Sequence, residues 1–282
     1  MWLDFSHPPI KEATFNEMRS LYPKRVSFDR THREVLKRTQ GKPYIGTLNF
    51  PFFESVGPCF IDDTGLTLKD SKYDSGVWRP IETENEFEVV QNWIGRQGSR
   101  VFIRSLLHAT LAFDFNLKNP TANDYTNIGR AEHDAKQHRD LNAIEMLVKH
   151  TTKTIRDIKL FSDTRYICAV PCQSDKEFDL PRTIVNEVSS RLDMVDLTDH
   201  FKLARSKANI KELAASCKWE AWSAAMVRIE HDLSGCTKII LIDDKYQSGA
   251  TLHYIASLLY AAGAQAVYGL CMVKTLRDDA NK

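Results

Sequence analysis

The sequence predicts an α/β protein, in which a parallel-sheet domain over residues 116–282 follows a β-rich region over residues 1–115. In the second part, short apolar runs of strand length alternate with stretches whose apolar residues recur at helical spacing. Strands that alternate with helices form right-handed crossover units, which build a parallel sheet covered on both faces. In the first part, turn residues separate short apolar runs, which is typical of β-structure.

The region 1–115 has apolar runs at residues 43–45, 59–61 and 101–103, each beside or shortly after glycine or proline. Asp62, Asp63 and Gly65 are predicted to form a hairpin turn. Tryptophans and many phenylalanines lie here, but no pattern indicates a reaction. We expect a β-containing domain or extension with an aromatic core.

The first elements of the second part follow from apolar spacing. A long amphipathic helix that ends near residue 158 is predicted from Leu141, Ile144, Leu147, Val148, Thr151 and Ile155. A strand follows at 165–170 and stops at Pro171, a helix opens at Pro181, and a short strand is expected at 194–197.

The remaining elements contain the clearest signals. The stretch 201–218 carries Lys202, Arg205, Lys207, Lys211 and Lys218 against a single acid, Glu212. A helix is expected over 219–231, a strand over 238–242, a helix over 250–262 that Gly263 caps, and a last strand over 266–273. In a parallel sheet of this kind, ligands bind at the carboxyl ends of the strands.

Composition narrows the classes of function. The chain has 282 residues and a net charge of +1, so its overall charge gives no reason to expect a nucleic acid or an anionic membrane as partner. The six cysteines include no CxxC pair and no zinc-site spacing with histidine, which favours reduced thiols in a cytoplasmic protein. The N-terminal residues do not form a signal peptide, and no apolar window is long enough to span a membrane.

The segment 239–252 carries the chemistry. Four apolar residues predict a buried strand, and Asp243 and Asp244 follow at its carboxyl end, where carboxylates can accept hydrogen bonds from a sugar diol. Residues 245–249 are expected to form a turn, in which Gly249 lets the backbone approach a ligand closely. The hydroxyls of Ser248 and Thr251 and the first amides of the next helix would then bind a phosphate. Together these features predict a site for a ribose 5-phosphate.

Other interpretations of this segment fit its residues less well. The acid pair could be an ordinary strand-end turn and residues 248–251 an ordinary helix start, but the two occur in series and in the order that a ribose phosphate needs. The segment matches neither a GxxxxGK[ST] phosphate loop nor a GxGxxG dinucleotide fingerprint.

The motifs IDDKYQSGATL at residues 242–252 and AAGAQAV at 261–267 resemble the phosphoribosyl pyrophosphate (PRPP) motif of type I phosphoribosyltransferases. The resemblance covers about residues 125–275. It is closest to the ComF-like subgroup, because a lysine-containing helix, a strand that ends in Val-Pro and a basic loop precede the motif. It implies a parallel-sheet fold and a transfer of phosphoribosyl from PRPP to a nitrogen acceptor, with release of pyrophosphate.

The resemblance also implies roles for individual residues. Asp243 and Asp244 would hold the ribose hydroxyls and take part in catalysis, and Arg205 and Lys207 of a closing basic loop would neutralise the pyrophosphate. Mg²⁺ would be bound through PRPP, with no direct protein ligand, and Lys136 would match the lysine of the segment that covers the site. The 5-phosphate loop would comprise Lys245, Tyr246, Gln247, Ser248, Gly249, Ala250 and Thr251, and the pyrophosphate loop Pro171, Cys172, Gln173 and Ser174.

Some positions depart from the family pattern. Gln247 and Ser248 replace the usual threonine pair, and Lys245 and Tyr246 replace an apolar pair. The Arg-Gly-Phe-Asn segment of ComF-like proteins is missing, and the basic residues nearest to its place are Lys176 and Arg182.

The sequence therefore leaves the acceptor open. The alternative function is that of a non-catalytic regulatory factor that binds PRPP or a nucleotide, or of a competence-like factor that acts with DNA. An enzyme that makes or cleaves a phosphoribosyl compound is a further alternative. Nucleic-acid binding and a homodimer are left open as well.

Overall fold

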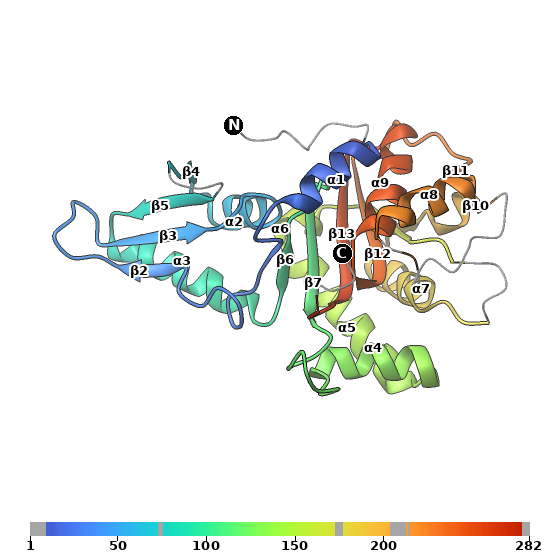
Figure 1. Cartoon of the computed structure of the whole chain (residues 1–282), viewed down its shortest axis with the longest axis horizontal. Coiled ribbons are helices and arrows are strands. Elements are labelled where there is room, and N and C mark those ends of the chain that lie inside the picture. The colour runs from blue at the N-terminus through green and yellow to red at the C-terminus, as the bar shows by residue number, and fades with distance from the viewer. Residues whose placement is uncertain (1–9, 73–75, 173–176, 204–212, 214, 278–282) are drawn as a thin grey trace.

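The computed structural model describes residues 10–72, 76–172, 177–203, 213 and 215–277. Its centre is a seven-stranded sheet in the order β1-β6-β7-β13-β12-β8-β9 (Figure 1). The strands β7, β13, β12, β8 and β9 run parallel, whereas β6 pairs antiparallel with both β1 and β7. The predicted α/β class with a mostly parallel sheet is confirmed. The strands are β1 (Arg25–Val26), β6 (Val101–Ile103), β7 (Ala109–Phe115), β8 (Tyr166–Ala169), β9 (Val195–Asp196), β12 (Lys238–Tyr246) and β13 (Ala266–Lys274).

Both faces of this sheet are covered, and the alternation of side chains along β12 shows how. Ile240 and Ile242 belong to one hydrophobic core, and Ile239 and Leu241 belong to a second core on the opposite face. The first core is closed by α2 (Val56–Thr64), α4 (Asn127–His138), α5 (Leu141–Asp157), α6 (Lys159–Ser162) and α7 (Leu180–Leu192). The second is closed by α1 (Glu12–Ser20), α8 (Ala215–Ala224) and α9 (Ala250–Ala261). Each fully buried Ile or Leu stabilises this arrangement by about 2 kcal/mol.

A smaller antiparallel sheet, in the order β2-β3-β5-β4, extends away from the central sheet together with α3 (Glu84–Gln97) (Figure 1). Trp93 of α3 is fully buried and packs against the rings of Phe28, Phe50, Phe60 and Phe102. Since Phe102 lies on β6, this aromatic cluster joins the small sheet to the large one. The strands are β2 (Leu36–Arg38), β3 (Gly46–Phe50), β4 (Lys69–Asp70) and β5 (Val77–Ile81).

Several expectations for residues 1–115 were wrong. The residues predicted to form a hairpin, Asp62, Asp63 and Gly65, lie at the end of α2, where Gly65 adopts φ 71° as the helix cap. The run 59–61 is likewise helical. This region contains α1, α2 and α3 as well as β1 to β7, so it is mixed rather than β-rich. Because β6 and β7 pair within the central sheet, that sheet draws on both sides of residue 115.

In the second part the predicted helices and strands are found, with two differences. The helix expected over 219–231 begins earlier and ends sooner, at Ala215 and Ala224, so α8 includes Lys218 of the basic stretch that was expected to be a loop. The strand β11 (Val227–Ile229) follows and pairs with β10 (Phe201–Leu203), which comes after the short 3-10 helix η1 (Thr198–His200). The strand expected to end at residue 242 continues to Tyr246, because β13 pairs with it as far as Lys274. Among the described residues, no helix has the length and apolar character needed to cross a membrane.

Candidate functional site

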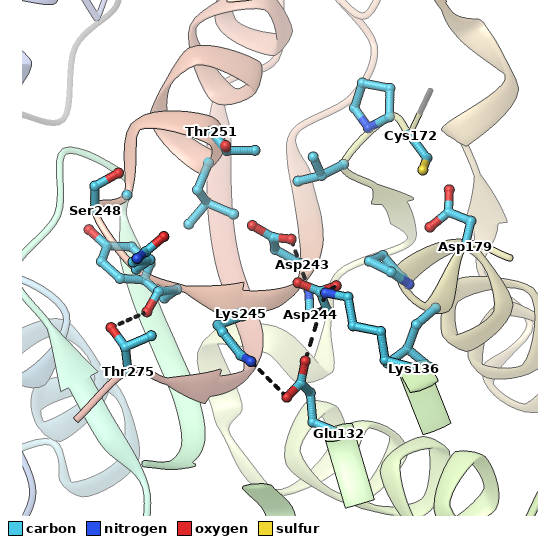
Figure 2. Close-up of a pocket in the computed structure, with 18 of the residues that line it drawn as sticks. Glu132, Lys136, Cys172, Asp179, Asp243, Asp244, Lys245, Ser248, Thr251 and Thr275 are labelled. Atoms are coloured by element: carbon cyan, nitrogen blue, oxygen red, sulfur yellow. Dashed lines mark hydrogen bonds and ion pairs between the residues drawn. The ribbon is translucent and has the colours of Figure 1, made fainter. Parts of the chain in front are cut away.

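A cavity of about 440 Å³ opens at the carboxyl ends of β8, β12 and β13 (Figure 2). This is the edge at which a parallel sheet binds ligands. Its walls come from β12 and its loop to α9, from the inner face of α4, from the segments before α7 and from α8. The lining residues include Glu132, His133, Lys136, Gln137, Pro171, Cys172, Phe178, Asp179, Lys218, Trp222, Asp243, Asp244, Lys245, Tyr246, Gln247, Ser248, Gly249, Thr251 and Thr275.

The loop between β12 and α9 turns sharply at Gly249. Gly249 adopts φ 82° immediately before α9, and a Cβ atom there would lie 2.2 Å from the hydroxyl of Tyr246. Only glycine fits this position. Gly249, the residue before α9, has no side chain that could cap the helix, but Ser248 Oγ accepts a hydrogen bond of 3.4 Å from the amide of Ala250. The first turn of α9 lines the cavity with Thr251 and Leu252. The amide groups of a first helical turn have no partner within the helix and carry the positive end of its dipole, so they favour an anion.

Lys245 and Tyr246 are placed differently from the expected turn, because both belong to β12. Tyr246 is buried beneath the loop, and this burial raises the pKa of its hydroxyl. Lys245 Nζ lies 3.0 Å from Glu132 Oε2, on α4. Both residues line the cavity, but the loop itself begins at Gln247.

The acid pair lies at the end of β12, and its two side chains point to opposite sides of the strand (Figure 2). Asp243 points towards the start of α9, and its Oδ1 accepts a hydrogen bond of 2.9 Å from the amide of Asp244. Asp244 points towards α4, where its carboxylate forms an ion pair with Lys136. The predicted residues Lys136, Asp243 and Asp244 therefore meet in one cavity.

A buried glutamate completes the charge network on this side. Only 1% of the Glu132 side chain is exposed, and its carboxylate lies 3.8 Å from Lys136 Nζ as well as 3.0 Å from Lys245 Nζ. Burial alone would lower the pKa of Lys136, but the carboxylates of Asp244 and Glu132 outweigh it and raise that pKa. Lys136 is therefore a fixed cation at the edge of the cavity.

The opposite wall of the cavity is formed by α8, which makes hydrogen bonds to the loop and to the start of α9. Lys218 is 4% exposed, and its Nζ donates a hydrogen bond of 3.2 Å to Gln247 Oε1. Trp222 Nε1 donates a hydrogen bond of 3.0 Å to Thr251 Oγ1. Burial lowers the pKa of Lys218, and the charge of Arg19 on α1 lowers it further. An anion at the loop would relieve this repulsion between cations.

A buried histidine holds the loop from behind. The Nδ1 atom of His253 lies 2.8 Å from the carbonyl oxygen of Gly249, and its Nε2 lies 3.1 Å from the amide nitrogen of Leu106. These contacts assign a neutral ring whose Nδ1–H donates and whose Nε2 accepts. The hydroxyl of Ser105 lies 3.2 Å from the same Nε2. Full burial lowers the pKa of His253 to about 4, so the ring stays neutral at physiological pH.

The expected pyrophosphate loop is placed only in part. Pro171 and Cys172 line the cavity, whereas Gln173, Ser174 and Lys176 lie outside the described residues. Arg205 and Lys207 of the basic stretch also lie outside them. Arg182 does not line the cavity and forms an ion pair with Asp199.

Sequence reasoning missed several residues of the site. Asp179 caps α7, accepting a hydrogen bond of 3.3 Å from the amide of Arg182, and lines the cavity opposite β12 (Figure 2). The cap signal, an aspartate shortly before Pro181, was present in the sequence. Glu132, Trp222 and His253 carry no local signal, because their roles depend on contacts with distant segments.

The fold and the site together define an α/β protein whose mostly parallel sheet ends in a cavity lined by charged side chains, with an acid pair on β12 and a glycine-containing loop after that strand. Searches against family models, curated proteins and solved structures found no match for this chain.

Proposed function

We propose that the cavity binds PRPP and that the protein is a phosphoribosyltransferase, which transfers the phosphoribosyl group to a nitrogen acceptor of the nucleobase type. The observation that carries the proposal is the order of groups along one strand and the loop after it. Carboxylates at Asp243 and Asp244 precede a glycine turn and the start of a helix, and all of them line one cavity. This order suits a sugar diol next to a phosphate.

The 5-phosphate is assigned to the first turn of α9. There it would accept hydrogen bonds from backbone amides and from the hydroxyls of Ser248 and Thr251. Lys218 supplies a positive charge on that side, through its contact with Gln247. The ribose then lies over the end of β12, where Asp243 and Asp244 accept hydrogen bonds from its hydroxyls. Lys136 holds the Asp244 carboxylate in position.

The reaction would break the bond between ribose C1 and the pyrophosphate oxygen and form a bond from C1 to the acceptor nitrogen. The electron pair leaves with pyrophosphate, and the acceptor nitrogen loses its proton to a carboxylate or to water. Positive charge develops at C1, so carboxylates close to the ribose stabilise the transition state. Asp243, which faces the phosphate loop, is the residue assigned to this task.

Mg²⁺ suits the oxygen donors of the cavity. Carboxylates line it from two directions, Asp243 on β12 and Asp179 before α7, and Mg²⁺ prefers oxygen ligands and keeps several waters. The ion would neutralise the leaving pyrophosphate. Asp179 would otherwise repel a pyrophosphate near Pro171 and Cys172, so this acid itself favours a metal-bound form of the substrate.

The acceptor would enter between α4 and the segment before α7. His133 and Gln137 line the cavity from α4, and Phe178 lines it from the other side. An aromatic ring and polar side chains are the groups that bind a flat heterocycle. This wall is assigned to the nitrogen acceptor.

Calorimetry with Mg-PRPP tests the binding step. The double substitution Asp243→Asn and Asp244→Asn should weaken PRPP binding about 100-fold or more, since each lost charge-assisted hydrogen bond costs about 1.5–3 kcal/mol. Asp193→Asn is the matched control, because Asp193 is an exposed helix cap at φ 53° where asparagine fits equally well. Equal affinity of the double variant and the wild type would overturn the assignment.

A pyrophosphate-release assay with PRPP, Mg²⁺ and a panel of nucleobases and amines tests the chemistry. Release that depends on one acceptor supports the transferase. Tight PRPP binding without release for any acceptor would favour the regulatory PRPP-binding protein instead.

A further inference from the structure

Two histidines and an aspartate gather at the carboxyl end of α4, beside the cavity. One potential ligand atom from each of His133, Asp134 and His138 lies within 4.8 Å of the other two. His133 Nδ1 is 2.9 Å from Asp134 Oδ1, and the ring centroids of the two histidines are 5.7 Å apart. We propose that these three residues bind a divalent transition-metal ion, with Zn²⁺ as the best fit.

The ligand set matches this class of metal. Imidazole nitrogen suits Zn²⁺, Cu²⁺ and Ni²⁺, and two imidazoles with one carboxylate form a common open zinc site. Zinc bonds of about 2.1 Å place tetrahedral ligands about 3.4 Å apart. The present separations, 2.9 Å between His133 and Asp134 and at most 4.8 Å within the set, lie on both sides of this value. His138 is exposed, so a rotation of its side chain can adjust the ligands to the ion.

The helix itself presents these ligands to a cation. Asp134 and His138 are four residues apart, which places both on one face of α4. His138 is the last residue of α4, where the negative end of the helix dipole favours a bound cation. The ring of His133 also packs against Tyr125, with centroids 5.0 Å apart, and this contact limits the movement of the imidazole.

The position of the cluster separates it from the Mg²⁺ expected with PRPP. His133 lines the cavity, whereas His138 lies at the exposed end of the helix, so the ion would sit at the rim. With three protein ligands, a tetrahedral ion keeps one position for water or for an oxygen of a molecule in the cavity. Mg²⁺ prefers oxygen ligands, so this site discriminates against it. The inference does not depend on the phosphoribosyltransferase assignment.

Calorimetric titration of the metal-free full chain with ZnCl₂ tests the site. Wild type should bind one equivalent, and His138→Asn and Asp134→Asn should each weaken binding at least about ten-fold, because the loss of even an outer-shell partner of a metal ligand costs about ten- to hundred-fold in affinity. Both positions are on the outer part of α4, and circular dichroism should show an unchanged fold. MgCl₂ at the same concentration should give no binding.

His231→Asn is the matched control. His231 stacks on His200 with centroids 4.3 Å apart, which is the other histidine pair in the described residues with close rings and the main competing place for zinc. This substitution should leave zinc affinity unchanged. The proposal is overturned if wild type binds no zinc, if the α4 variants bind it as tightly as wild type, or if only His231→Asn weakens binding.

Discussion

The buried, neutral ring of His253, which is hydrogen-bonded to Gly249 and Leu106, makes the stability of the protein depend on pH. We consider the substitution His253→Gln, which removes the titrating ring but keeps a donor and an acceptor. The folded pKa of His253 is about 4, against an ordinary value of 6.5. Between these two values the unfolded chain holds a proton at this histidine and the folded chain does not. Stability is therefore fully present above the ordinary pKa and is lost as the pH falls towards 4.

The size of the effect follows from the difference of about 2.5 pH units, because each unit corresponds to about 1.4 kcal/mol. Wild type should lose about 3 kcal/mol of its free energy of unfolding at this position between pH 7 and pH 4. The glutamine variant starts less stable, since its hydrogen bonds to Gly249 and Leu106 are poorer, but it lacks this pH dependence. The advantage of wild type over the variant should shrink by the same amount.

Urea denaturation of both proteins at a series of pH values measures this difference directly. Other groups titrate in the same range, notably Asp114, whose pKa burial raises to about 6. That group acts in the opposite sense, because the folded state retains its proton and loses stability as the pH rises to 6. Subtracting the two curves removes it, since both proteins contain it. A difference that stays constant from pH 7 to pH 4 would refute a buried neutral His253.

Three further substitutions test the loop and its supports by thermal or urea denaturation. Gly249→Ala should lower the free energy of unfolding by roughly 1–3 kcal/mol, because the new methyl group meets the hydroxyl of Tyr246 and the residue keeps a positive φ. Gly235→Ala is the control: there is open space around Gly235, so the loss should be less than about 1 kcal/mol. Trp222→Phe removes the hydrogen bond to Thr251 and should cost about 1 kcal/mol; no change would mean that α8 does not support the loop. Lys136→Met removes the cation that pairs with the carboxylates of Glu132 and Asp244, and it should lower the free energy of unfolding by roughly 1–3 kcal/mol at neutral pH. The loss should be smaller in acid, where the carboxylates are protonated. An equal loss at both pH values would argue against the ion pair.

The elements that the sequence predicted are those with strong local signals. Four consecutive apolar residues before an acid pair marked β12, and the spacing of apolar residues marked α5. The helix α3 was missed although Thr83 caps it and accepts a hydrogen bond from the amide of Glu86, a capping signal that its sequence contains. The helix α2 was also missed, because Gly57 and Pro58 in its first turn are residues typical of turns. Gly57 is needed there because a side chain would collide with Phe53.

The sequence predicts the part of the site that lies in one segment, but not the contacts that distant segments make with it. Residues 243–251 lie close together in sequence, so their chemistry could be read from one segment. The partner of Asp244, by contrast, is 108 residues away in the sequence. Glu132 is buried within the same network, and no local pattern distinguishes it from a solvent-exposed acid of an amphipathic helix. Such pairings depend on how α4 packs on the sheet, which a single sequence does not specify.

The position of β13 in the sheet has a consequence for the synthesis of the protein. This strand lies between β7 and β12, although it follows both of them along the chain. While the ribosome is still making residues 266–274, β7 and β12 have no common neighbour, and both expose apolar edges that are open to pairing with other chains. The sheet is thus completed from its middle, and only after residues 266–274 have been made. A nascent chain arrested before β13 should be a substrate for chaperones rather than a partly working protein.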